Sequence, residues 1–169
     1  MKNICFIITL SLISFSCKKN QEKEYTQSNT KKSTIIVTDT TNIDGVLLEL
    51  INDNGKAKLK INTKEYKLSG DIKINPPCYF LRWEKNKVEN FSYPDVGVKH
   101  TLVILGNMAT KDDRKTFGAE NSDNICGTGM QGILFKKDSI IVTNKILTHS
   151  FVCADIGTDE KDFSGFAHD

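Results

Sequence analysis

The side chains best suited to metal binding or nucleophilic catalysis are three histidines and five cysteines. His100, His149 and His168 lie far apart, without the H-x-x-H or H-E-x-x-H spacing that brings two imidazoles to one metal ion. The cysteines include no C-x-x-C pair. We therefore predict no catalytic residue, no metal site and no cofactor. An alternative is a site that the three histidines form together in the folded protein.

A glycine-rich segment at 127–132 matches the pattern G-x-G-x-x-G. A dinucleotide site needs a strand before this pattern and a helix after it, so that the helix N-terminus meets the pyrophosphate. Here a long loop over 107–131 is expected before the last glycine, and a strand after it. We interpret the pattern as the start of a hairpin, and the nearby carboxylates of Asp155, Asp159 and Glu160 as surface acids.

The N-terminus has the pattern of an export signal. A short positive start, Met1-Lys2, leads into an apolar run of 13 residues over 4–16, which ends at Cys17 and is followed by two lysines. The run is too short to cross a bilayer but has the length of a signal-peptide core. The run, the small residue Ser16, the cysteine and the polar segment after it together resemble the lipobox of bacterial lipoproteins. Ordinary secretory cleavage after the small-x-small pattern Ser14-Phe-Ser16 stays an alternative.

The resemblance implies that the leader is cut before Cys17 and that this cysteine carries diacylglycerol. Each buried methylene contributes roughly 0.8 kcal/mol, so two or three acyl chains hold a protein firmly to a membrane. We expect a signal peptide at 1–16, a lipidated cysteine and disordered tether at 17–33, and a single β-rich domain at 34–169. The position directly after the cysteine, Lys18, resembles that of lipoproteins sorted to the outer membrane. The sequence does not decide which leaflet holds the anchor.

Three thiols remain if Cys5 leaves with the leader and Cys17 carries lipid. The segments 132–135 and 140–142 look like the two strands of a hairpin. Extending their pairing outward brings Cys126 and Cys153 within reach of each other, and an oxidising compartment favours the bond. We predict a Cys126–Cys153 disulfide. Cys78, which follows two prolines and opens an aromatic segment, is interpreted as a buried structural cysteine.

Alternation of apolar and polar residues dominates the remaining chain and predicts strands. We expect them at 34–38, 46–51, 58–62, 66–69, 71–75, 79–83, 101–105, 132–135, 140–143 and 150–153. A turn is expected at 52–55, since Asn and Gly tolerate positive φ. A short helical turn at 158–166, capped by Thr158, would dock Phe163 and Phe166 on the body. The fold class is all-β and mainly antiparallel, as a small barrel or sandwich.

Aromatic residues gather between positions 79 and 93, which hold five of the chain's 14 (one Trp, four Tyr and nine Phe). On a strand, alternate residues share a face, and aromatic and Arg side chains are favoured at recognition surfaces. An alternative is a central strand covered on both sides. The possible binding face comprises Tyr79, Leu81, Arg82, Trp83, Phe91 and Tyr93.

The formal net charge of +2 gives no electrostatic reason to expect nucleic acid as a partner. The expected partners are a membrane, through acyl chains on Cys17, and an envelope protein. We therefore expect a non-catalytic binding module of inhibitor, immunity or accessory-subunit type. The alternatives are a β-barrel carrier of a small apolar ligand and a small periplasmic hydrolase.

Overall fold

The computed structural model describes residues 34–84 and 87–169, and these form a mainly antiparallel β structure with two α-helices. This confirms the predicted fold class. The expected signal peptide, Cys17 and the expected tether lie outside the described residues.

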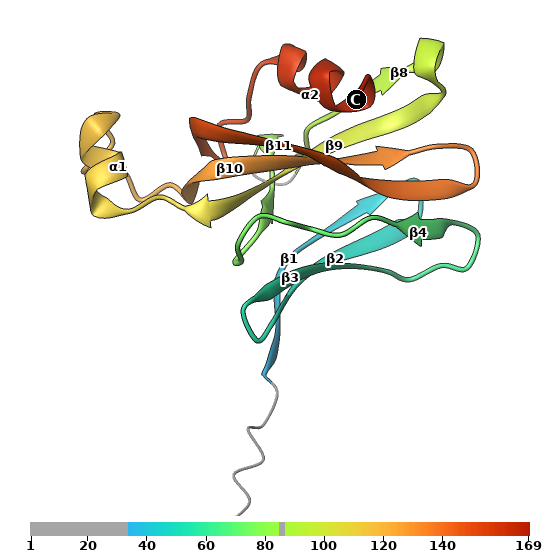
Figure 1. The fold of residues 1–169 in the computed structure, drawn as a ribbon, viewed down its shortest axis with the longest axis horizontal. Helices are drawn as coiled ribbons and strands as arrows, with labels where there is room; N and C mark the ends of the chain where they lie inside the picture. Colours follow the sequence, from blue (N-terminus) through green and yellow to red (C-terminus); the bar gives the residue numbers. More distant parts are fainter. Residues whose placement is uncertain (1–33, 85–86) are drawn as a thin grey trace, which may run out of the picture. The chain divides into compact units, whose positions relative to one another are not determined.

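Strands of two sheets and one helix lie in three layers (Figure 1). The first sheet is antiparallel, in the order β1 (Ile35–Ile43), β2 (Val46–Asp53) and β3 (Lys56–Ile61). The central sheet has the order β4 (Lys67–Ser69), β11 (Ser139–Cys153), β10 (Cys126–Phe135), β9 (Val98–Met108) and β5 (Tyr79–Phe80), and β8 (Asn90–Tyr93) also pairs with β9. A short ladder joins β6 (Arg82–Glu84) to β7 (Lys87–Val88). The helical elements are η1 (Pro94–Val96), α1 (Lys111–Thr116) and α2 (Glu160–Ala167).

Tight turns connect the strands of the first sheet. Asp44 and Gly45 join β1 to β2 with φ values of 50° and 84°, and Asn54 and Gly55 join β2 to β3 with 52° and 87°. Two successive positive φ angles suit a hairpin between twisted strands. The turn predicted at 52–55 is confirmed.

The central sheet is covered on both faces, which explains why its middle strands are apolar without alternation. In β9, Leu102 and Ile104 pack toward the first sheet, whereas Val103 and Leu105 pack toward α2. All four side chains have no exposed surface. The predicted docking of the C-terminal helix is confirmed, since α2 covers one face of the sheet (Figure 1).

The N-cap of α2 differs from the prediction. Asp159 caps the helix by accepting the amide hydrogen of Lys161 at 2.9 Å, whereas Thr158 donates its hydroxyl to Asp162 at 2.5 Å. Phe163, which the helix docks, is fully buried.

The long loop predicted over 107–131 is wrong at both ends. β9 continues to Met108, β10 already begins at Cys126, and α1 lies between them, with a capping box formed by Thr110 and Asp113. The glycine-rich pattern is therefore a strand. A Cβ at Gly132 would lie 2.7 Å from the Cβ of Phe166, so glycine lets the helix approach the strand closely. The segments predicted at 140–143 and 150–153 belong to one strand, β11.

The strand predicted at 71–75 is also absent from the described structure, although its alternation is real. Ile72 and Ile74 are buried, at 9% and 3% exposure. The peptide groups on either side of Ile72 are bound by a side chain instead of a neighbouring strand. The buried amide of Gln131 accepts the Lys73 amide hydrogen at 2.8 Å and donates to the Asp71 carbonyl at 3.0 Å. The alternation therefore predicted which side chains are buried, but it did not predict what the backbone of this segment binds.

Candidate functional site

The predicted binding face does not form as one strand, because the chain changes partner at Leu81. The Leu81 amide donates to the Val103 carbonyl of the central sheet at 3.0 Å, and the next amide, that of Arg82, donates to the Ala154 carbonyl at 2.7 Å. This break turns Leu81 into the core, where it is fully buried. The prediction that Leu81 and Trp83 share one face is therefore wrong, since Trp83 is 69% exposed.

Arg82 fixes the position of this segment by binding the first sheet. Its guanidinium donates to both carboxylate oxygens of Asp39 on β1, at 2.7 and 2.8 Å, and only 14% of each side chain is exposed. Asp39 also accepts the Phe80 amide hydrogen at 2.9 Å. A two-pronged Arg–carboxylate contact sets orientation as well as distance. Arg82 is therefore a support for the neighbouring Trp83, and it lines a polar groove and not the cleft beside Trp83.

Trp83 and Phe91 line an open cleft of about 300 Å³, which we call the Trp83 cleft. Its remaining walls come from the segment between them: Lys87, Val88, Glu89 and Asn90. Phe91 is half-buried, and its ring packs on Phe163 of α2 with centroids 4.8 Å apart. The cleft thus has one aromatic wall that is anchored in the core and one that is exposed.

Glu89 is a buried carboxylate at the base of this cleft, at 7% exposure. Burial raises the pKa of Glu89 above its usual 4.5, and a 3.3 Å hydrogen bond from the Thr158 amide opposes that rise. A side chain at Gly157 would collide with the Glu89 carboxylate. The turn before α2 is therefore fitted against this carboxylate.

A polar groove of about 430 Å³ adjoins the Trp83 cleft and shares Lys87, Val88 and Asn90 with it. In the groove, both ring nitrogens of His100 are occupied: Nε2 by the Asp44 carboxylate at 2.9 Å and Nδ1 by the Asn90 side chain at 3.1 Å. A ring engaged on both sides is held in place and does not face a bound molecule as a free base.

Asp44 carries a second partner, the Lys99 ammonium. The hydrogen bonds from Lys99 and then from His100 lower the pKa of Asp44 to about 2, so this carboxylate is charged at neutral pH. Sequence reasoning did not identify this groove. The Asp44-Gly45 dipeptide was an available turn signal, but only the fold brings the turn to His100.

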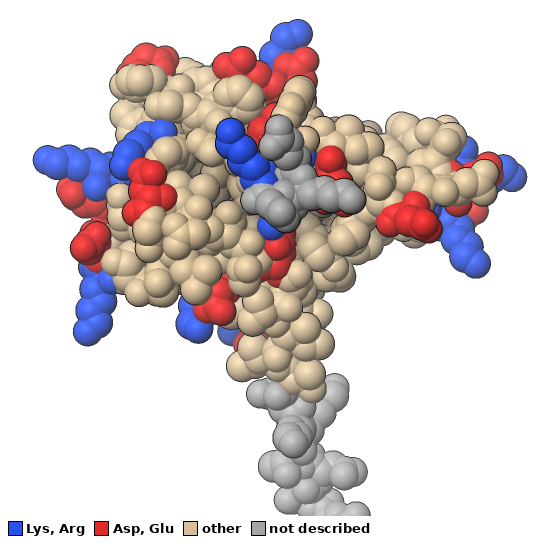
Figure 2. All heavy atoms as spheres, turned by 180° about the vertical axis from the view of Figure 1, so that it is seen from behind, with Lys and Arg blue, Asp and Glu red and all other residues tan. Residues whose placement is uncertain are grey.

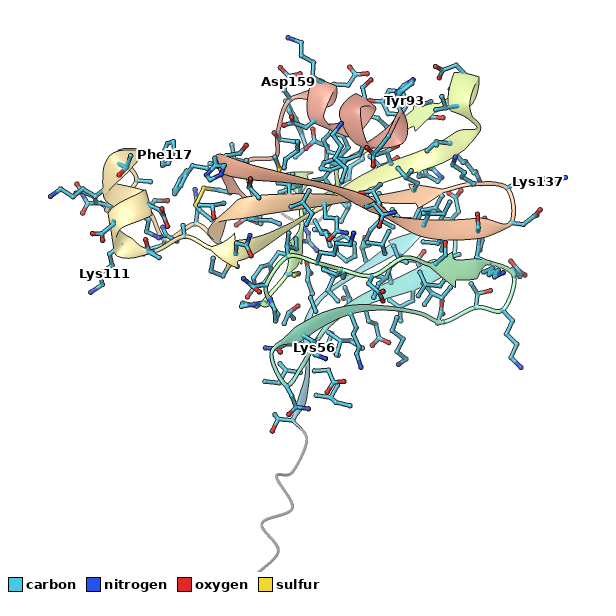
Figure 3. The ribbon with its side chains drawn as sticks, viewed as in Figure 1. Lys56, Tyr93, Lys111, Phe117, Lys137 and Asp159 are labelled. Atoms are coloured by element: carbon cyan, nitrogen blue, oxygen red, sulfur yellow. A yellow bond between two sulfur atoms is a disulfide. The ribbon has the colours of Figure 1, made fainter. Side chains whose placement is uncertain are left out.

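The two tyrosines of the predicted face lie away from the cleft. The Tyr93 hydroxyl donates to the Glu160 carbonyl of α2 at 3.3 Å, and its ring contacts His168 with centroids 5.5 Å apart (Figure 3). Burial, followed by the charge of Glu160, raises the pKa of Tyr93. Tyr79 lies in β5 and packs partly into the core beneath α2. Of the predicted face, the structure brings only Trp83 and Phe91 together in this cleft.

The fold leaves the three histidines apart. His100 is bound in the polar groove, His149 lies near α1, and the His168 Nε2 is 2.9 Å from Asp95. Within residues 34–84 and 87–169, no cluster of three or more His, Cys, Asp or Glu side chains has the geometry to hold a metal ion.

The predicted Cys126–Cys153 disulfide is confirmed, and the two residues are register partners in the β10–β11 ladder. Cys78 is free and 2% exposed, in agreement with its interpretation as a buried cysteine. Burial raises the pKa of Cys78 to about 12, so the thiol stays protonated and is a poor nucleophile.

Comparisons with protein-family models, curated proteins and solved structures find no match to this chain. In the part of the chain that the structure describes, neither helix has the length and apolar character needed to cross a bilayer.

Proposed function

We propose that this protein is an exported bacterial lipoprotein, held to the outer membrane by acyl chains on Cys17, that acts as a non-catalytic binding module of inhibitor, immunity or accessory-subunit type. The observation that carries the binding role is the exposure of Trp83 beside Phe91 over a concave surface. Tryptophan is the residue type most enriched among energetically dominant interface residues. A protein partner that covers Trp83 removes a large apolar surface from water.

The surroundings of the cleft favour a protein partner over a reaction. In the adjoining groove, Arg82 and His100 are both engaged in internal contacts, and in the cleft itself the Glu89 carboxylate is buried and accepts the Thr158 amide hydrogen. The adjoining groove supplies Lys87 and Asn90 as an exposed polar rim around the aromatic walls. Figure 2 shows Lys and Arg side chains interspersed with Asp and Glu over one face of the molecule.

The partner can be identified by photo-crosslinking in intact cells. A photoreactive phenylalanine analogue is placed at position 83 and, as a matched control, at the exposed Phe117, which lies outside the cleft. We expect a discrete adduct with one envelope protein from position 83 and not from position 117. The purified partner should bind wild type and lose at least tenfold affinity for Trp83→Ala, which corresponds to about 1.4 kcal/mol. The same affinity for both proteins would refute the binding role of Trp83.

The anchor is tested separately by labelling cells with a fatty-acid analogue. Wild type and Cys5→Ser should incorporate label and fractionate with the membrane, whereas Cys17→Ser should do neither. Cys5 is the matched control because it also lies in the N-terminal segment but precedes the predicted cleavage site. Label in Cys17→Ser would rule out the proposed anchor without bearing on the Trp83 cleft.

A further inference from the structure

We propose that the protein has a second binding site, at the α1 end of the central sheet, and that it takes a neutral saccharide. The site is an open cavity of about 440 Å³ between α1 and the ends of β9, β10 and β11, which we call the arm pocket. It shares no lining residue with the Trp83 cleft. The proposal depends neither on the lipid anchor nor on a protein partner.

A flat aromatic platform forms one wall of the arm pocket. Phe117, directly after α1, is 53% exposed, and its ring stacks on Phe151 of β11 with centroids 4.9 Å apart and an interplanar angle of 18°. Figure 3 shows Phe117 on the side of α1 that faces the central sheet. Because the Phe117 ring stacks on Phe151, it is held in place before a ligand binds and loses little side-chain entropy on binding.

Polar groups surround this platform. Thr148 and His149 are exposed in the pocket, and within the described residues their side chains make no hydrogen bond. The Asp113 carboxylate faces the same cavity, and hydrogen bonds from Thr110 lower its pKa, so it is a charged acceptor. The lining therefore offers a hydroxyl and an imidazole that are uncommitted, beside one carboxylate.

The backbone turns His149 outward at a cost. Between the pairs Gly127–Val152 and Gly129–Thr148, three residues of β11 lie opposite one residue of β10, and His149 has a φ of 68°. A non-glycine residue in the left-handed region is strained, and bulges often re-aim side chains next to binding sites. This irregularity directs His149 and Phe151 toward α1.

A pyranose ring fits this combination of groups. Its C–H face is apolar and can lie on Phe117, while hydroxyls at its edge both donate and accept hydrogen bonds, as Thr148, His149 and Asp113 require. The single carboxylate disfavours an anionic ligand. One carboxylate that is already engaged with Thr110 is also a weak basis for selecting a cation. The cavity volume lies in the range of small-molecule sites, roughly 300–1,000 Å³.

The test is saturation-transfer NMR and calorimetry with cellotetraose and chitotetraose on the folded, disulfide-bonded protein. We expect at least one of these sugars to bind wild type at millimolar concentration. Phe117→Ala should weaken binding about tenfold, Phe117→Tyr should retain it, and Thr148→Val should weaken it about threefold. Thr148 and Phe117 are both exposed, so these variants should keep the wild-type circular dichroism spectrum.

Trp83→Ala is the matched control and should bind the sugar as wild type does. The proposal is overturned if neither sugar binds, if Phe117→Ala binds as tightly as wild type, or if tetramethylammonium occupies the pocket and the sugars do not. Loss of sugar binding in Trp83→Ala would also overturn it, since that result would move the site to the other cleft. Failure of the protein-partner experiment leaves all of these outcomes unchanged.

Discussion

The Trp83 cleft and the arm pocket both present an exposed aromatic ring, but they hold it in different ways. Trp83 lies on the short β6–β7 ladder, and the contact that fixes this ladder to the first sheet is the Arg82–Asp39 pair. Phe117 follows a short helix whose flanking segments are tied down by the Cys126 disulfide and by hydrogen bonds from Arg114.

An electrostatic contact at the Trp83 cleft and a covalent one at the arm pocket thus do the same structural task. Cys153 precedes Ala154, whose carbonyl binds the Arg82 amide, but neither Asp39 nor the disulfide lines the other site's cavity. The two sites should therefore respond separately when one device is removed.

Removal of the disulfide should have the largest effect. The bond closes a loop with a sequence separation of 27, for which chain entropy predicts a loss of roughly 3–4 kcal/mol in the free energy of unfolding. In Cys126→Ser/Cys153→Ser, measured by urea denaturation, we also expect faster amide exchange near α1. Emission of Trp83, the only tryptophan, should match wild type before unfolding. A shifted native emission would show that the two ends are coupled.

Asp39→Asn should lower the free energy of unfolding by roughly 3 kcal/mol, because it leaves the Arg82 guanidinium poorly paired where only 14% of its side chain is exposed. Native Trp83 emission should change, and stacking at Phe117 should not. Asp53→Asn is the matched control. Its partner Lys58 is 58% exposed, so its loss should cost less than about 1 kcal/mol. Equal losses in the two variants would mean that the Arg82 pair is not the support we describe.

The sequence predicted the Cys126–Cys153 disulfide because both cysteines lie near one hairpin. Extending the hairpin outward from 132–135 and 140–142 placed Cys126 and Cys153 within reach of each other. Two register shifts in the β10–β11 ladder, which the alternation did not predict, make them direct partners. The two rings of α2 were also predicted from local sequence, since a spacing of three places Phe163 and Phe166 on one helical face.

The sites themselves were less predictable because they depend on contacts between distant segments. Nothing near Leu81 in the sequence indicates that the next amide will bind Ala154, so the break that exposes Trp83 was not foreseen. Part of the lining of the arm pocket comes from residues 107–131, which we predicted to be a loop. The glycines of the G-x-G-x-x-G pattern there allow strands to approach closely and do not mark turns. Its platform joins Phe117 to Phe151, which no local pattern connects.

Arg114→Met should loosen α1 and the segment that follows it, residues 111–125, which we call the arm, without unfolding the domain. The Arg114 guanidinium donates to the carbonyls of Ser122 and Asn124, each at 2.9 Å, and loss of these bonds should lower the local opening free energy by about 1–2 kcal/mol. Hydrogen exchange at residues 119–125 measures this, with the exposed Lys115→Met as control. If exchange there is unaltered, the disulfide alone holds the arm.

Glu89→Gln should have the smallest effect and an opposite sign. Burial raises the pKa of Glu89 in the folded protein, so the folded state binds the proton more tightly than the unfolded chain does. The ionised carboxylate therefore costs stability at pH values above its folded pKa, and this cost disappears as the pH falls through that pKa and then below the usual 4.5. The glutamine variant should be slightly more stable than wild type at pH 7.5, by urea denaturation, and equal to it near pH 4.

The exposed Glu65→Gln, outside both cavities, is the control and should leave the free energy of unfolding at pH 7.5 close to that of wild type. Destabilisation by Glu89→Gln at pH 7.5 would show that the charge itself holds the turn at Gly157 in place. The base of the Trp83 cleft would then be stabilised by that carboxylate as well as by the Arg82 pair, and the contrast with the cross-linked arm would be sharper still.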